Sequence, residues 1–260
     1  MKKYILIVAL FIFSNLSYSS VVVINGLTHI YSGNSGDQMR GEIILLNTSN
    51  EEQRVSFDLK DAIFSCTGSR IFTNEQTHHQ SSLEWFDGSL MDKILDPKEK
   101  YVYRFAITIP KDKALKGSYW TSLMIDVEKP IKKDKISKNI GLDTKVRYAI
   151  GLLTNVNSLD VVSLDFQKMD LDKSGNNKKL KVKLTNQNLF IEGVKLSLEI
   201  YDSNGKNILE TATARNMVFP GFCKDYNFDI SSLPKGNYEC LLVADSRNQF
   251  LGTNISLTIE

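Results

Sequence analysis

The segment YVYRFAITI, residues 101–109, decides the fold class of this chain. Aromatic and β-branched side chains occupy every second position, at Tyr101, Tyr103, Phe105, Ile107 and Ile109. Successive side chains of a β-strand point to opposite faces, so this spacing places all of these residues on one side. The segment therefore predicts a strand with one face in a hydrophobic core.

The same alternation continues outward in both directions, with turn residues about every ten positions, and no convincing amphipathic helix appears. Short strands at this spacing are typical of a β-sandwich. The strands expected in the first half are Val21–Tyr31, Gly41–Leu46, Arg54–Phe64, Ser69–Phe72, Ser82–Phe86, Tyr101–Ile109, Ser118–Val127 and Thr144–Asn155. The second half predicts seven more. We expect an all-β chain with two consecutive immunoglobulin-like sandwiches, at residues 20–157 and 158–260, after a signal peptide at 1–19.

The first residues have the pattern of an export signal. Lys2 and Lys3 precede an apolar run from Tyr4 to Phe13, and small residues follow at Ser17 and Ser19. This order predicts a signal peptide cleaved after Ser19. The run is shorter than the ~20 residues that a membrane-spanning helix requires, and no later segment comes close. We expect an exported protein of the periplasm or cell surface, without a transmembrane segment in the mature chain.

Composition and motifs exclude more functions than they suggest. Among 260 residues, 32 Lys and Arg balance 30 Asp and Glu, so net charge indicates no nucleic-acid partner. The chain lacks a Gly-x-Ser-x-Gly elbow, a phosphate-binding glycine loop and a His-Glu-x-x-His motif. Its adjacent pair His78 and His79 lies in a polar stretch that indicates a loop. The sequence predicts a non-enzymatic protein with no cofactor and no metal site.

The cysteines and one tyrosine bear on the stability of the fold. The chain has three cysteines, Cys66, Cys223 and Cys240. Because this number is odd, at least one thiol is free or paired between chains. Cys240 either pairs with Cys223 or is a buried thiol, and free cysteine packs well as a small hydrophobe. Tyr238 follows a Gly236 turn and precedes Cys240 by two residues, which is the layout of a tyrosine corner.

The last strand of the first half is the best candidate for a binding element. It places Val146, Tyr148, Ile150 and Leu152 on one face, preceded by Lys145 and including Arg147. The last strand of a sandwich lies at a sheet edge, where unpaired N–H and C=O groups can accept an incoming strand. We expect partner binding by Lys145, Arg147, Tyr148, Ile150 and Leu152. Alternatively, this strand only completes the core.

A lysine-rich loop precedes that strand and includes Lys132, Lys133 and Lys135. Such a loop beside a binding face can meet an acidic partner, although a charge run is also typical of a solvated loop. A different class of function, a carbohydrate-active envelope module, would use Trp85 and Trp120 as an exposed aromatic platform. Exposed tryptophans would favour this alternative, and buried tryptophans would favour partner binding by the strand.

The first half resembles the peptidoglycan-binding domain of the WxL-interacting protein family. The resemblance is carried by Gly41–Asn47, Ser82–Phe86, Leu95–Glu99, Gly117–Trp120 and Val146–Ile150. It implies a peptidoglycan-binding immunoglobulin-like domain followed by a second one, and a role in holding a protein or cell-wall partner.

More distantly, the chain resembles the periplasmic pilus chaperone family. That resemblance rests on the signal peptide, on Ile107–Pro110, on Tyr119 and Trp120, and on the lysine-rich loop before the last strand. It implies an assembly chaperone that donates this strand to envelope subunits, with Arg147 or Lys145 placed to anchor a subunit's terminal carboxylate. The partner is thus an envelope protein subunit or peptidoglycan, and the sequence leaves the oligomeric state open.

Overall fold

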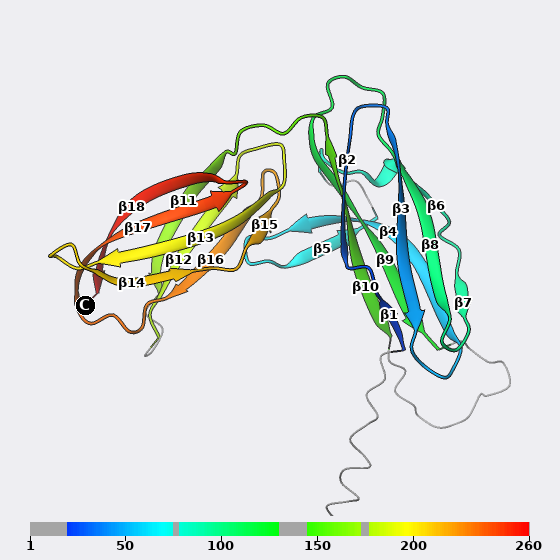
Figure 1. Cartoon of the computed structure of the whole chain (residues 1–260), viewed down its shortest axis with the longest axis horizontal. Coiled ribbons are helices and arrows are strands. Elements are labelled where there is room, and N and C mark those ends of the chain that lie inside the picture. Colours follow the sequence, from blue (N-terminus) through cyan, green and yellow to red (C-terminus); the bar gives the residue numbers. More distant parts are fainter. Residues whose placement is uncertain (1–19, 75–77, 130–144, 173–176, 260) are drawn as a thin grey trace, which may run out of the picture.

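The computed structural model describes residues 20–74, 78–129, 145–172 and 177–259. The predicted signal peptide and the basic loop with Lys132, Lys133 and Lys135 lie outside the described residues. Two β-sandwiches stand side by side, joined by the segment that follows residue 156 (Figure 1). The predicted all-β class and the two consecutive immunoglobulin-like sandwiches are therefore confirmed.

Strands β1 to β10 form the first sandwich. One sheet has the order β1 (Val21–Val23), β3 (Gln38–Asn47), β8 (Lys100–Thr108) and β6 (Phe86–Gly88). The other has the order β2 (Thr28–Gly33), β10 (Val146–Val156), β9 (Gly117–Glu128), β4 (Gln53–Phe64) and β5 (Arg70–Thr73), with β7 (Lys93–Leu95) also on β4. Among the strand pairs that the structure describes in this sandwich, β2–β10 is parallel and the others are antiparallel.

The core of the first sandwich forms as residues 101–109 predict. Tyr103, Phe105, Ile107 and Ile109 are all buried, and Tyr103 stacks on Phe57 with ring centroids 4.3 Å apart. The residues between them on β8 are more exposed. Alternation in this segment therefore identified the core face correctly.

Two expected strands differ from those observed. The expected strand Val21–Tyr31 is divided into β1 and β2, which belong to different sheets. Gly26 lies between them with φ +92°, a backbone conformation that favours glycine, so the chain crosses from one sheet to the other there. The expected strand Ser82–Phe86 is instead a 3-10 turn, η2 (Leu83–Trp85), that ends where β6 begins.

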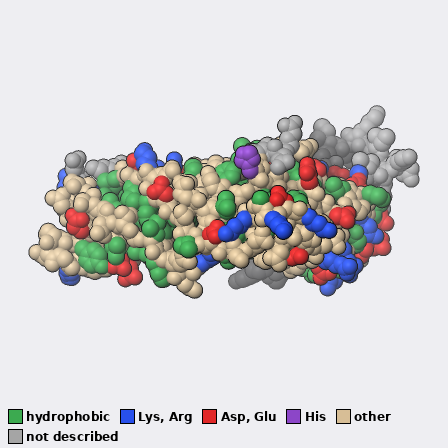
Figure 2. Space-filling view, turned by 90° about the horizontal axis from the view of Figure 1, so that it is seen from above, with side chains coloured by type: hydrophobic (Ala, Val, Ile, Leu, Met, Phe, Trp, Pro, Cys, Tyr) green, Lys and Arg blue, Asp and Glu red, His purple; other side chains and the backbone are tan. Residues whose placement is uncertain are grey.

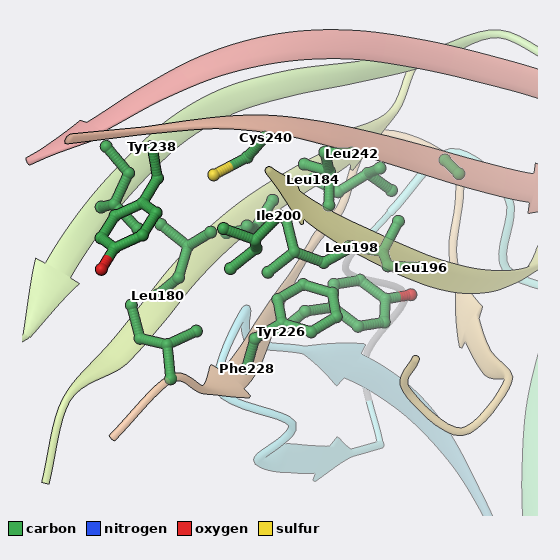
Figure 3. Close-up of a cluster of buried hydrophobic side chains, with 14 of the residues drawn as sticks. Leu180, Leu184, Leu196, Leu198, Ile200, Tyr226, Phe228, Tyr238, Cys240 and Leu242 are labelled. Atoms are coloured by element: carbon green, nitrogen blue, oxygen red, sulfur yellow. The ribbon is translucent and has the colours of Figure 1, made fainter. Parts of the chain in front are cut away.

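The second sandwich has its own core. One sheet has the order β11 (Leu164–Asp172), β12 (Lys179–Asn186) and β16 (Cys223–Asp229). The other has the order β14 (Asn207–Ala212), β13 (Glu192–Tyr201), β17 (Gly236–Ser246) and β18 (Gln249–Ile259), with β15 (Asn216–Val218) on β13. Figure 3 shows how side chains from both sheets fill the space between them: Leu180, Leu184, Leu196, Leu198, Ile200, Tyr226, Phe228, Tyr238, Cys240 and Leu242.

The tyrosine corner and the buried thiol are both present in this core. The Tyr238 hydroxyl donates a hydrogen bond to the carbonyl oxygen of Pro234 at 2.9 Å, across the turn that opens β17. Cys240 is free and buried, and its burial raises the pKa of the thiol to about 11. Pairing of Cys240 with Cys223 is excluded, because Cys223 is bonded to Cys66.

Replacing Tyr238 with Phe removes that hydroxyl and leaves the Pro234 carbonyl without this donor. We expect Y238F to lower the free energy of unfolding by about 1 kcal/mol, measured by urea denaturation. The matched control is Y201F, since the Tyr201 hydroxyl bonds to the side chain of Glu199 on the same strand near the surface. Equal effects of the two substitutions would contradict a stabilising corner.

Candidate functional site: the open edge of β10 and the cleft between the sandwiches

Strand β10 is flanked on both sides for only half of its length. It pairs with β9 from Val146 to Val156, whereas β2 pairs only with the part from Gly151 onward. Within the described residues, the part from Val146 to Ile150 has no strand on its second flank. We call this part the open edge. The expected edge position is therefore correct for the first half of the strand and wrong for the second half.

The backbone groups available at the open edge follow from the strand geometry. The Gly151 amide donates to the Leu27 carbonyl oxygen at 2.9 Å, so the backbone groups of Gly151 point toward β2. Residues two apart on a strand present their N–H and C=O to the same side. Ala149 and Arg147 consequently direct theirs at the open flank. An extended segment added here would find donors and acceptors ready for pairing.

The side chains predicted to bind a partner divide between the two faces of β10. Ile150 and Leu152 are 0% exposed and belong to the core of the first sandwich. Tyr148 is half-buried and donates to the Val21 carbonyl oxygen at 2.6 Å. Alternation alone could not tell the inner face from the outer one, because apolar or small residues occupy both. The binding role of these positions stays a prediction, but in this conformation the side chains of Ile150 and Leu152 are buried and their backbone groups face β9.

The opposite face of β10 carries a charged cluster at one end. Arg147 lies directly across from Asp126 of β9, with Nε and Nη2 2.6 and 2.8 Å from the two carboxylate oxygens. Lys145 Nζ is also 2.8 Å from Asp126 Oδ2. The hydrogen bond from Arg147 is the largest cause that holds the pKa of Asp126 at about 2. Both cations that sequence reasoning selected therefore already pair with the single carboxylate of Asp126.

The other end of this face opens into a cleft between the two sandwiches, with a cavity of about 240 Å³. Ala149, Gly151 and Leu153 of β10 form part of its wall. Other lining residues come from the β4–β5 hairpin and from the second sandwich, among them Phe64, Arg70, Arg215, Phe219, Phe222 and Lys224. Sequence reasoning missed this cleft, because its two walls are separated by about half of the chain.

Aromatic packing closes the floor of the cleft. Phe64 stacks on Phe219 of the second sandwich with ring centroids 3.7 Å apart, and Trp120 lies 4.9 Å from Phe219. Trp120 is 1% exposed and its indole N–H donates to the Ala62 carbonyl oxygen at 2.8 Å. Trp85 is 8% exposed and packs on Tyr119. The exposed platform that the carbohydrate-binding alternative requires is therefore absent at Trp85 and Trp120, because these contacts bury both rings.

His78 belongs to this packing and not to a solvent-exposed loop. Its ring stacks on Trp120 with centroids 4.1 Å apart, and its Nε2 lies 2.7 Å from Asp61 Oδ1. Burial lowers the pKa of His78 despite the nearby carboxylate. No group of three or more metal-ligating side chains occurs among the described residues.

Three cations surround the cleft, and they differ in how they are held. Arg215 is fixed by Asp245, with Nη2 2.5 Å from Oδ2, and by the Gly193 carbonyl oxygen. Arg70 lies over the Phe64 ring at 5.9 Å, and Lys224 Nζ lies beside Gly68. Within the described residues, neither Arg70 nor Lys224 has a carboxylate partner. The cleft thus carries net positive charge, whereas acidic and basic side chains are interspersed over the face shown in Figure 2.

A disulfide between Cys66 and Cys223 joins the two sandwiches at the rim of the cleft. Cys66 lies in the turn between β4 and β5, and Cys223 begins β16. The hairpin extends sideways from the first sandwich to reach the second (Figure 1). The odd cysteine number and the predicted export were the only sequence signals for a bridge, and they did not indicate which residues pair.

Comparison with solved structures shows that the fold is similar to that of a fimbrial chaperone. The class 5 fimbriae chaperone CfaA has a TM-score of 0.50 at 13% identity, over 90% of this chain and 98% of that one. A chain of the chaperone–tip adhesin complex of CFA/I fimbriae scores 0.49 at 13% identity, over 91% and 98%. A chain of the SafA pilin–SafB chaperone complex of Salmonella enterica scores 0.46 at 12% identity, over 94% and 98%.

No family model and no curated protein matches the sequence. The WxL-interacting resemblance, with its expectation of peptidoglycan binding, therefore gains no support, and the chaperone resemblance is supported at the level of fold. In the part of the chain that the structure describes, no helix has the length and hydrophobicity needed to cross a bilayer.

Removal of the Arg147 guanidinium tests the charged cluster. Because the folded-state pKa of Asp126 lies below its ordinary value of 3.8, the ion pair stabilises the protein above about pH 4 and is lost as the pH falls toward 2. In R147A we expect the pKa of Asp126 to rise toward its ordinary value and the acid-side loss of stability to become shallower. NMR titration of the Asp126 carboxyl carbon measures this change. An unchanged pKa, equal to that of the distant R104A control, would contradict the assignment.

Proposed function

We propose that this protein is an exported, non-enzymatic assembly chaperone that holds an envelope protein subunit by strand pairing at the open edge of β10. The observation that carries the proposal is the continuity of this edge with the positively charged cleft. An extended subunit segment paired with Arg147 and Ala149 would run alongside β10 toward Gly151 and the cleft. Backbone pairing supplies affinity in this mode of recognition, and side-chain contacts at the ends fix the register.

The apolar surface beside the open edge supports a protein partner. Ile24 and Leu27 lie in and beside the segment that crosses between the sheets, Ile30 lies on β2, and all three are exposed. Leu27 also lines the cleft. Exposed apolar side chains that adjoin unpaired backbone groups are typical of a strand-accepting surface. Sequence reasoning missed these residues because it treated Val21–Tyr31 as one core strand.

The cleft supplies an anchor for the end of the bound segment. Arg70 and Lys224 have no carboxylate partner within the described residues, and a chain-terminal carboxylate is a small anion that a guanidinium and an ammonium group bind well. The anchoring role that the chaperone resemblance implies for Arg147 or Lys145 is assigned in this proposal to Arg70 and Lys224, because Asp126 already pairs with the other two.

A photo-cross-linking side chain tests the open edge. We expect benzoylphenylalanine at Leu27 to capture a defined subunit in the envelope of the cells that make the protein, identified by mass spectrometry. The matched control is the same residue at Met91, which is exposed and lies outside the cleft, between β6 and β7. A149P removes the N–H that faces the open flank while leaving the ladder to β9, so it should lower the yield at least tenfold. Undiminished capture in folded A149P would contradict strand pairing.

A pair of charge variants tests the cleft. We expect R70A/K224A to weaken capture at Leu27 about tenfold or more, because a charged hydrogen bond contributes roughly 1.5–3 kcal/mol. R40A/R104A removes the same charge from the other sheet of the first sandwich and should leave the yield unchanged. Equal losses in both variants would indicate a nonspecific charge effect. Retention on purified sacculi without any captured subunit would favour cell-wall binding and contradict the chaperone proposal.

A further inference from the structure

Besides the aromatic packing around Phe219, two further attachments between the sandwiches differ in kind. On one side, the Ser118 amide and the Gln80 side chain donate to the Leu189 carbonyl oxygen at 2.8 and 2.7 Å, and the Ile191 amide donates to Ser118 Oγ at 2.8 Å. On the other side, the tip of the β4–β5 hairpin meets β16 through the Cys66–Cys223 disulfide and one hydrogen bond, from the Asp225 amide to the Cys66 carbonyl oxygen at 2.8 Å. Of these two attachments between described residues, the second includes a covalent bond.

We propose that the Cys66–Cys223 disulfide is a redox-sensitive lock on the cleft, so that its reduction by an envelope dithiol weakens subunit binding. The inference rests on the proposed function for the identity of the partner site. Residues Ser65, Gly68, Cys223 and Lys224 form a continuous part of the cleft wall around the bond. Breaking the disulfide therefore changes the contacts of residues that line the cleft directly.

The turn that carries Cys66 keeps its shape without the bond. The Ser65 amide donates to the Ser69 carbonyl oxygen, and the Gly68 amide donates to the Ser65 carbonyl oxygen, each at 3.0 Å. Gly68 adopts φ +91°, which suits glycine in a tight turn. Cys223 is held independently by the pairing of β16 with β12 at Thr185. Reduction therefore removes the covalent tie between two locally ordered elements and leaves them held by the Phe64–Phe219 packing and the Asp225–Cys66 hydrogen bond. Reoxidation can rejoin the two sulfurs without refolding.

The exposure of the disulfide to solvent favours its reduction by an external thiol over attack by Cys240. Cys66 and Cys223 are both partly exposed, whereas Cys240 is buried in the core of the second sandwich. Burial also raises the pKa of the Cys240 thiol, which suppresses the thiolate that exchange requires. The third cysteine of the described chain is thus unsuited to attack the bond, and the redox state of the lock depends on the compartment.

The reaction is an ordinary thiol–disulfide exchange. A thiolate of the dithiol attacks one sulfur of the Cys66–Cys223 bond, the S–S bond breaks, and the other cysteine leaves as a thiolate. The second thiol of the reductant then attacks the mixed disulfide and releases the first cysteine. Two electrons and two protons pass from the dithiol to the protein, which leaves two cysteine thiols and an oxidised reductant.

The oxidised and reduced forms of the protein can first be compared without a bound subunit. Mass spectrometry after alkylation should count one thiol in the oxidised mature protein and three after treatment with dithiothreitol. Small-angle X-ray scattering should then show a broader distribution of distances between the sandwiches, and hydrogen exchange should rise at the β4–β5 hairpin. The double variant C66S/C223S should match the reduced protein and be insensitive to dithiothreitol. An identical scattering profile and identical exchange in both redox states would overturn the lock.

Subunit capture then separates this inference from the proposed function. With the cross-linker at Leu27, we expect at least tenfold lower capture by the reduced protein, restored by reoxidation, and low capture by C66S/C223S in either state. C240A retains the bond and should respond as the unmodified chain does. Equal capture in both redox states would overturn the lock while leaving the chaperone proposal intact. Absence of capture by the oxidised protein would instead overturn the proposed function.

Discussion

The packing of Phe64 and Trp120 of the first sandwich against Phe219 of the second is the contact on which the candidate site depends. Each sandwich has a separate core. The small cluster between them, which also includes Ala62 and Leu153, sets how the sandwiches face each other. Aromatic rings bury large areas in defined geometries, so a few of them suffice to hold two domains at one angle. The cleft exists because this contact fills only part of the space between the sandwiches.

Strand β10 connects the cores to the cleft because its two faces serve different purposes. Ile150 and Leu152 extend inward into the first core, while Ala149 and Leu153 face the cleft. Small residues at positions 149 and 151 leave room for the cavity. Their backbone groups lie at the boundary between the open edge and the part covered by β2. One strand therefore combines a rigid inner face with a surface suited to pairing.

Charge is distributed so that the open edge and the cleft differ electrostatically. At the far end of the β10 face, the single charge of Asp126 partly neutralises Arg147 and Lys145, and exposed ion pairs of this kind contribute little to stability. Arg70 and Lys224 surround the cavity without such neutralisation among the described residues. A bound segment would pass from cations that already pair with a carboxylate to cations in the cleft that do not, which favours a segment that ends in a carboxylate.

The sequence by itself determined the strand composition of the chain, the core face of residues 101–109 and the tyrosine corner at Tyr238. Each of these follows from local spacing, since the period of a strand and the layout of a turn are set by residues close together in the chain. Only the tertiary structure decided the burial of Trp120 and Ile150, the change of sheets at Gly26, the pairing of Cys66 with Cys223 across 157 residues, and the cleft with Arg70 and Lys224. These features depend on which faces meet when distant segments pack, and alternation along one strand carries no information about what will cover it.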